Sequence, residues 1–274
     1  MTAPSSLPPL VDGATRLYGI IGDPIAQVRS PEVLTARFRA AGRNALLLPF
    51  HVAPARFEES VRGLKALLNL DGIIVTVPYK ARILPELDRV LPTGQKVGAV
   101  NAMRRETDGS WTGDNFDGKG LLQSLAKMGH EVRGLKAAII GCGGAGSAVA
   151  VAFAEKGAAA LTLYDIEEGR ARDLARRLET LFPDCVFGVL PPDPSRQDIL
   201  VNASPVGMAP GEGLPYPFGP LDPRLLVIDV VMKPPLTPLL RFAESCGCRT
   251  VQGRAMLDGQ VEEVMGFFGI GEAG

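Results

Sequence analysis

The stretch LKAAIIGCGGAGSAVAVAFAEKG, residues 135–157, constrains the fold of this chain more than any other feature. An apolar strand-like run, a glycine-rich turn and an apolar helix-like run follow one another directly. This order predicts a parallel βαβ unit. The turn contains Gly141, Gly143, Gly144, Ala145 and Gly146. Its glycines allow the backbone to approach a pyrophosphate, and the helix N-terminus offers free N–H groups to it. We therefore expect these five residues to bind a dinucleotide; the alternative is a purely structural glycine turn.

The end of the next predicted strand, 160–166, indicates which dinucleotide fits. It carries Tyr164-Asp165, and Asp165 follows Gly141 by 24 residues. An acid at this place accepts hydrogen bonds from the adenosine ribose and repels a 2′-phosphate. The nearest bases, Arg170 and Arg172, fall inside the following predicted helix. We predict NAD as the cofactor, with NADP less favoured; capping of that helix is the alternative role for Asp165.

Strand-like and helix-like stretches alternate along the whole chain, which predicts an α/β protein with parallel sheets. Further strands are expected at 16–22, 44–52, 71–78, 199–204 and 225–231. Further helices are expected at 31–42, 56–68, around 83–91, and at 119–129, 167–182, 236–247 and 255–269. A hairpin, or two short strands, is expected over 99–115, around the turn TDGS. The proline- and glycine-rich stretch 205–223 is expected to be a functional loop, because so long a loop in a compact domain usually has a role.

Composition excludes several classes of function. The net charge is -1 over 274 residues, without blocks of like charge, so neither nucleic acid nor an anionic membrane is an expected partner. The chain shows no secretory signal and no apolar run long enough to span a bilayer, so we expect a cytoplasmic protein. Its cysteines, Cys142, Cys185, Cys246 and Cys248, are scattered and expected to be reduced.

Histidine is almost absent, since the chain has only His51 and His130. No metal site is expected for that reason. A Ser-His-Asp triad would need one of these two histidines, and the chain lacks the GxSxG motif that often carries its serine. Any proton transfer should therefore involve Lys, Asp, Glu, Tyr or the cofactor.

Two polar segments are candidates for that proton transfer. Thr76 lies near the end of the predicted strand 71–78 and Lys80 follows it, where side chains face the binding crevice of an open α/β sheet. Asp117 lies in the glycine-flanked segment GDNFDGKG. Separately, a lysine after a strand and an aspartate in a DG pair are usually surface and turn residues. Beside a dinucleotide, a lysine with a lowered pKa could take a proton from an alcohol. Asp117 could hold the lysine in place, or an ionised Asp117 could raise the lysine pKa and oppose that role; the sequence leaves both open.

The loop GDPIAQVRSP, residues 22–31, precedes the first predicted helix. Ser30 and Pro31 are suited to the N-cap and the first helical position. Val28 is the apolar residue of this otherwise polar stretch.

With these segments in view, the chain resembles the shikimate dehydrogenase family. The motifs GDPIAQVRSP, VTVPYK, GAVNA, GDNFDGKG, IIGCGGAG, NASPVGM and MLDGQ follow one another in the order of that family. The resemblance covers residues 18 to 268. It implies two domains: a substrate-binding α/β domain over 1–118, completed by a returning C-terminal helix over 253–274, and a Rossmann dinucleotide domain over 119–252.

The resemblance implies reversible oxidation of the ring hydroxyl of shikimate, or of quinate, to a ketone. It assigns Lys80 and Asp117 as the catalytic pair. Substrate-binding positions would be Val28, Ser30, Thr76, Asn101 and Gln260, and Asn202, Met208 and Gly253 would lie near the nicotinamide. Ordinary capping for Asn101 and Gln260, and core packing for Met208, are the alternatives. The expected partner is a small hydroxylated ring acid, and the protein is expected to be a monomer or a homodimer.

Three departures from the family pattern concern the substrate. Val28 stands where the family commonly has the first hydroxyl of a Ser-x-Ser pair, Ile74 where it often has Asn, and Met232 where it often has Tyr. The family's Asn-Arg-Thr cluster for a 2′-phosphate is replaced by Tyr164-Asp165-Ile166, which resembles the NAD-preferring quinate/shikimate branch. These departures leave two further hypotheses: a paralogue acting on a related, less polar ring acid, and a non-catalytic dinucleotide-binding protein. A folate-linked dehydrogenase is less favoured, because it would not account for the substrate loop and GDNFDG.

Overall fold

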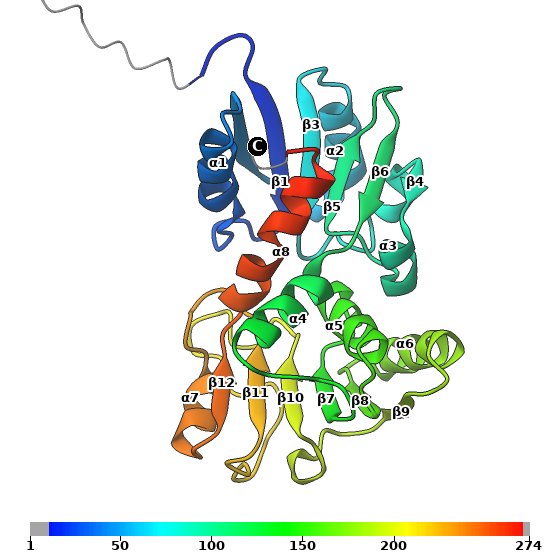
Figure 1. The fold of residues 1–274 in the computed structure, drawn as a ribbon, viewed down its shortest axis with the longest axis vertical. Helices are drawn as coiled ribbons and strands as arrows, with labels where there is room; N and C mark the ends of the chain where they lie inside the picture. Colours follow the sequence, from blue (N-terminus) through cyan, green and yellow to red (C-terminus); the bar gives the residue numbers. More distant parts are fainter. Residues whose placement is uncertain (1–10, 271–274) are drawn as a thin grey trace, which may run out of the picture.

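A computed structural model describes residues 11–270 of the chain, and the predicted α/β class is confirmed. Figure 1 shows two sheets one above the other, with α8 (Arg254–Phe267) running from the lower sheet to the upper one. The predicted substrate-binding domain includes residues 1–10 and 271–274, which lie outside the described part.

The upper sheet has six strands in the order β2-β1-β3-β5-β6-β4. Its strands are β1 (Arg16–Gly22), β2 (Ala45–His51), β3 (Leu70–Val75), β4 (Arg89–Val90), β5 (Ala102–Arg105) and β6 (Trp111–Asp114). The first three are parallel, but β5 runs antiparallel to β3 and β6, so this sheet is mixed rather than parallel as expected. The hairpin predicted over 99–115 is the β5–β6 pair and accounts for the reversal.

Helices cover both faces of the upper sheet. The helical segments between its strands are α1 (Ser30–Ala40), α2 (Phe57–Lys65), α3 (Pro92–Val97) and the short 3-10 turns at Pro54–Arg56 and Leu84–Glu86. Leu34 and Phe38 of α1 pack with Tyr18 on one face, while Phe57 and Val61 of α2 pack on the other. Apolar residues of α8 join the α1 side, so the end of the chain completes the core of its beginning.

The lower sheet has the strand order β12-β11-β10-β7-β8-β9, and all its pairs are parallel. Its strands are β7 (Lys136–Ile140), β8 (Ala160–Tyr164), β9 (Val186–Val189), β10 (Ile199–Asn202), β11 (Leu226–Asp229) and β12 (Arg249–Val251). This is the Rossmann order, with its topological switch point between β7 and β10, where ligands bind at the carboxyl ends of the strands.

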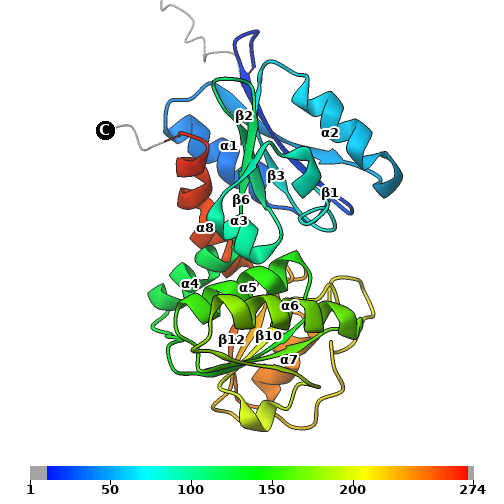
Figure 2. The same ribbon diagram turned by 90° about the vertical axis from the view of Figure 1, so that its right-hand side faces the viewer.

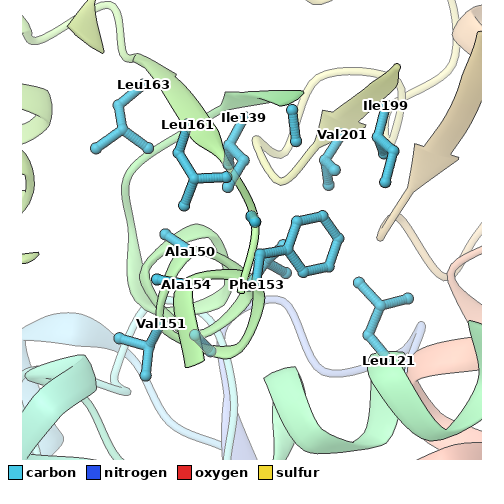
Figure 3. Packing of buried hydrophobic residues seen from close by; sticks show 14 of the residues in the cluster. Leu121, Ile139, Ala150, Val151, Phe153, Ala154, Leu161, Leu163, Ile199 and Val201 are labelled. Atoms are coloured by element: carbon cyan, nitrogen blue, oxygen red, sulfur yellow. The ribbon is translucent and has the colours of Figure 1, made fainter. Parts of the chain in front are cut away.

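Alternate residues of the lower strands face opposite helical layers. Ile139 packs with Phe153 and Leu121 in the cluster drawn in Figure 3, whereas Ala138 and Ile140 face the other side. The helices of this half are α4 (Asp117–Lys127), α5 (Gly144–Glu155), α6 (Glu168–Leu181) and α7 (Pro238–Ser245), with a 3-10 turn at Pro194–Arg196. Residues of α4, α5 and α6 contribute to the first layer, and α7 covers the second; Figure 2 shows α5 and α6 side by side.

Some predicted elements were wrong. The helix expected around 83–91 is only a 3-10 turn followed by β4, because the chain there pairs with β6: the Asp88 N–H donates to the Trp111 carbonyl, and the Trp111 N–H donates to the Asp88 carboxylate. The sequence analysis missed α3, β9 and β12. The two strands lie at the edges of the lower sheet, where only one side of a strand needs a partner.

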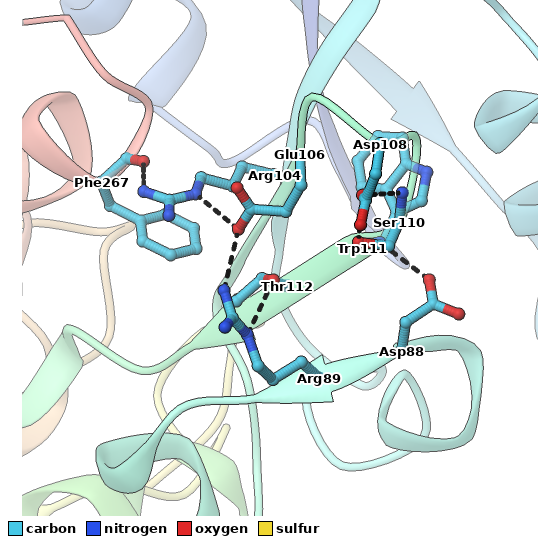
Figure 4. A network of polar contacts seen from close by, with 9 residues as sticks. All are labelled: Asp88, Arg89, Arg104, Glu106, Asp108, Ser110, Trp111, Thr112 and Phe267. Carbon is cyan, nitrogen blue, oxygen red and sulfur yellow. Dashed lines mark hydrogen bonds and ion pairs between the residues drawn. The ribbon is translucent and has the colours of Figure 1, made fainter.

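The end of α8 is tied to the upper sheet by Arg104 of β5. Its guanidinium donates to the Phe267 carbonyl at 2.7 Å and stacks over the Phe267 ring at 4.8 Å, while Glu106 accepts from its Nε (Figure 4). A second contact between the halves lies at α3, where Lys96 pairs with Glu155 and Arg177 donates to the Val97 carbonyl. These contacts help to hold the upper and lower sheets together, in addition to the connecting chain.

Candidate active site

Helices α4 and α8 cross with almost no space between their backbones. A Cβ placed on Gly259 would lie 1.9 Å from the Gly120 carbonyl oxygen, and one on Gly120 would lie 2.7 Å from the Gln260 Cβ. Only glycine at both positions permits this approach. The crossing brings the first turn of α4, with Asp117, next to Gln260 of α8.

Lys80 and Asp117 form an ion pair at 2.5 Å between Nζ and Oδ2. Lys80 comes from the loop after β3, and its carbonyl accepts from the Val100 N–H at 2.7 Å, which fixes its backbone. The side chain of Lys80 is 14% exposed and that of Asp117 only 4%. The two residues predicted as a catalytic pair, 37 positions apart in sequence, thus meet in a largely desolvated place.

Asn101 extends this pair into a larger group. Its Nδ2 donates to Asp117 Oδ1 at 2.9 Å and to Gln260 Oε1 at 2.8 Å, and its Oδ1 accepts from the Phe116 N–H. We call Lys80, Asp117, Asn101 and Gln260 the polar cluster. Sequence analysis proposed all four, and the structure brings them together from a loop, a strand connection and two helices.

A cavity between the two sheets contains the polar cluster and continues into an apolar region. Val28, Ile74 and Met232, which we call the apolar trio, all line it. Val28 and Ile74 pack against the same core cluster of the upper sheet. Ser30 and Thr76 also line the cavity, so every predicted substrate residue borders one space.

The predicted N-cap role of Ser30 was wrong. The helix α1 begins at Ser30 itself, its N-cap is Arg29, and that cap makes no side-chain hydrogen bond. Pro31 lies in the first turn, but as the second helical residue and not the first as predicted. Ser30 is buried at the start of this helix.

The glycine turn lies between β7 and α5, as predicted. Gly141 has φ +92°, and a Cβ there would lie 2.6 Å from the Ser204 nitrogen of the loop after β10. Around Gly143, by contrast, a Cβ would meet nothing within 4 Å, so the turn is open on that side. The first turn of α5 leaves N–H groups without intrahelical partners. These features fit a dinucleotide pyrophosphate at Gly143 to Gly146.

Asp165 lies just past β8 and is bound to the glycine turn. Its Oδ2 accepts from the Cys142 N–H at 2.8 Å and its Oδ1 from the Glu167 N–H at 2.9 Å. The carboxylate is half-buried and is not the N-cap of α6, since that position is Glu167. Ile166, directly after it, is 90% exposed, which is unusual for an isoleucine of a folded domain.

The other predicted cofactor residues divide into two groups. Ala145, Met208 and Gly253 line the cavity. Asn202 does not: it is completely buried, and its side chain bonds to the Val206 carbonyl, Ser204 and Asp229. Its position shapes the loop after β10, so any influence on a cofactor passes through that loop.

Asp229 at the end of β11 is a buried acid that the sequence analysis missed. It accepts hydrogen bonds from Asn202, the Val231 N–H and the Thr237 hydroxyl. Burial raises the pKa of its carboxyl above the ordinary value. Asp229 thereby joins the loops after β10 and β11, and both loops line the cavity. The sequence signal that could have identified Asp229 is an acid at the end of an apolar strand, in LLVIDVV.

Among residues 11–270, no three or more His, Cys, Asp or Glu side chains are grouped so that they could hold a metal ion, and no helix is long and apolar enough to cross a bilayer. Cys142, inside the glycine turn, is buried, and burial raises the pKa of its thiol to about 12, so it is unreactive as a nucleophile.

Comparison with known proteins agrees with this geometry. A family model described as the shikimate dehydrogenase substrate binding domain matches residues 20–103. The chain is 39% identical over 256 residues to the shikimate dehydrogenase (NADP(+)) of Rubrobacter xylanophilus, covering 91% of this chain and 89% of that protein.

Two solved structures extend the comparison. Shikimate 5-dehydrogenase of Listeria monocytogenes, in complex with shikimate and NAD, superposes with a TM-score of 0.84 at 31% identity, covering 96% of this chain and 94% of that one. The ligand-free 5-ketofructose reductase of a Gluconobacter strain gives 0.79 at 29% identity, covering 93% and 92%. With near-complete coverage by relatives above 30% identity, this chain belongs to the shikimate dehydrogenase family of oxidoreductases.

Proposed function

We propose that this enzyme interconverts shikimate and its 3-dehydro ketone with a nicotinamide dinucleotide, and that it prefers NAD. The observation that carries the proposal is the polar cluster, which stands in one cavity with Ala145 of the glycine turn. A hydroxyl bound beside Lys80 would therefore lie close to the predicted cofactor site.

The proton step is assigned to Lys80 and its neighbours. A bound dinucleotide would supply the hydride acceptor for oxidation of the ring carbon, and Lys80 Nζ, in its uncharged form, would take the hydroxyl proton. Asp117 holds the Lys80 amine through Oδ2 and is itself oriented by Asn101 through Oδ1. Asn101, Thr76 and Gln260 are assigned to the hydroxyls of the ring, and Ser30 to its carboxylate. In the reductive direction the Lys80 ammonium returns the proton to the ketone oxygen.

The domain assignment follows the same division. Residues 1–118 with 253–274 would bind the substrate, and 119–252 the dinucleotide. The match of the substrate-domain family to residues 20–103 supports the first part. The Rossmann strand order and the open side of the glycine turn support the second, with Gly141, Gly143, Gly144 and Gly146 at the pyrophosphate.

The preference for NAD rests on the surface beyond β8. Asp165, Glu167 and Glu168 are three acids within four residues, while the bases that follow, Arg170 and Arg172, are already paired with the two glutamates. A 2′-phosphate would be repelled there, whereas a ribose diol can donate to Asp165. The exposed Ile166 offers an apolar surface to the adenine. The Listeria relative was solved with NAD, although the Rubrobacter relative carries NADP(+) in its name.

The decisive test is an initial-rate assay of the purified enzyme with NAD and NADP, each against shikimate and quinate. We expect turnover of shikimate with a higher kcat/KM for NAD. The double variant Asp165→Asn/Ile166→Arg should reverse the cofactor preference, whereas Leu68→Arg, at another exposed apolar position, should leave it unchanged. A wild-type preference for NADP would refute the assignment of Asp165, and absence of turnover with both acids would refute the substrate.

The apolar trio favours a second candidate substrate, a related hydroxylated ring acid with fewer polar groups. Val28, Ile74 and Met232 offer no hydrogen bond to a ligand, yet all three border the cavity. The similarity to a 5-ketofructose reductase supports the idea that this architecture accepts different polyols. A panel of ring acids lacking single hydroxyls decides between the candidates: a kcat/KM above that for shikimate supports the second one.

A further inference from the structure

Gly144 opens α5 in the lower half of the molecule, and the stem of Lys80 from the upper half lies directly on it. A Cβ placed on Gly144 would be 2.9 Å from the Lys80 Cβ, 3.1 Å from its Cδ and 3.4 Å from the Ala99 Cβ. Real Cβ atoms essentially never approach another atom within 3.0 Å. A larger residue at position 144 would therefore clash with Lys80, whereas one at position 143 would meet nothing within 4 Å of its Cβ.

This close contact cannot be relieved by rotating the Lys80 side chain. The position of a Cβ is set by the backbone, and the Lys80 backbone is held by the hydrogen bond from the Val100 N–H to its carbonyl. Any side chain at position 144 must then displace either the loop that carries Lys80 or helix α5.

Displacement of α5 would also move the partner of Lys80. A Cβ on Gly118 of α4 would lie 2.2 Å from the Ala148 carbonyl oxygen of α5, so the two helices are in close backbone contact beside Asp117. Asp117 is therefore expected to follow α5 rather than Lys80. Separating α5 from the Lys80 loop lengthens the 2.5 Å contact between Lys80 Nζ and Asp117 Oδ2.

We propose that Gly144 is a positioning residue for Lys80: its missing side chain sets the distance between Lys80 and Asp117, in addition to any role at the pyrophosphate. This inference rests on the proposed role of Lys80 in proton transfer. The glycine turn would then contribute to both hydride transfer and proton transfer, because Gly144 faces the cofactor site as well as Lys80.

The test compares Gly144→Ala with Gly143→Ala. Alanine is a good helix former and Gly144 has no positive φ, so the variant is expected to fold. We expect Gly144→Ala to lower kcat by about 10- to 100-fold, the range that a misplacement of about 1 Å can cause. It should also shift the pH profile of kcat/KM, a readout that a change in NAD binding alone would not move. Gly143→Ala should raise the Kd for NAD and leave the pH profile in place.

A double-variant cycle keeps the inference separate from the function on which it rests. In a Lys80→Ala background, Gly144→Ala should cost little further activity, since the residue that it positions is gone. Equal losses in both backgrounds, or an unchanged kcat and pH profile in Gly144→Ala, would overturn the inference. Full activity of Lys80→Ala would instead overturn the proposed role of Lys80.

Discussion

The polar cluster and the apolar trio border the same cavity but are built in different ways. The four residues of the polar cluster bond to one another and are positioned by helix crossings and backbone contacts. The residues of the trio lie on a loop, a strand and a second loop, and their apolar side chains form no hydrogen bonds with one another. A change in the cluster should therefore spread to its other members, whereas a change in the trio should remain local.

The largest expected effect is that of Asp117→Asn. It leaves the charge of Lys80 without its partner in a largely desolvated place, which costs about 3–5 kcal/mol for a buried ion pair. We expect kcat to fall by at least 100-fold and the free energy of unfolding in urea to decrease. Asp114→Asn, at a buried acid in the same segment, is the matched control: its amide oxygen can still accept from the Gly94 N–H, so kcat should stay nearly unchanged. Equal losses of kcat in the two variants would contradict a special role for Asp117 in the reaction.

Asn101→Ala should have the next largest effect. It leaves Asp117 Oδ1, Gln260 Oε1 and the Phe116 N–H each without a hydrogen-bond partner, and one such buried group costs about 1–3 kcal/mol. Urea unfolding of Asn101→Ala, Gln260→Ala and the double variant measures their coupling, which we expect to be about 0.5–3 kcal/mol. Additive losses would show that the cluster is a set of neighbours rather than one unit.

Val28→Ser tests the trio. A new hydroxyl near a bound carboxylate can contribute about 1.5–3 kcal/mol, so the KM for shikimate should fall by about tenfold or more while kcat changes little. Ile25→Ser introduces the same polar group into the same loop and core cluster, at a residue that does not line the cavity. It should not alter the KM. An unchanged KM in Val28→Ser as well would place the carboxylate elsewhere.

The smallest effect concerns Asp229, which supports the loops without bordering the cavity. Because burial raises the pKa of its carboxyl in the folded protein, its contribution to stability is complete below the pKa of the unfolded chain, near 3.8, and is lost as the pH rises through the folded pKa. The free energy of unfolding of Asp229→Asn, taken relative to that of the wild type, should therefore increase as the pH rises from 4 to 7. Thermal unfolding at both values tests this, and a gain that is larger at pH 4 would contradict it.

Local patterns in the sequence were sufficient for most strands and helices and for the glycine turn. Lys80, after a strand, and Asp117, in a glycine-flanked segment, were candidates from local position, but only the family motifs assigned them as a pair and added Asn101 and Gln260. Edge strands such as β9 were missed, since half-exposed strands show little alternation. The helix around 83–91 was wrong because a tertiary contact, the pairing of Asp88 with Trp111, prevailed over local pattern. The approach of Lys80 to Gly144 joins residues 64 positions apart, which no local pattern reveals.

The crossing of α4 and α8 at Gly120 and Gly259 also limits how such an enzyme can diversify. Any side chain at either glycine would separate the helices and disrupt the polar cluster, so we expect neither position to contribute to a new specificity. Val28, Ile74 and Met232 lie on segments outside this crossing and can be exchanged one at a time. A library confined to these three positions should therefore change which acid is accepted while most of its members keep the fold and the capacity for hydride transfer.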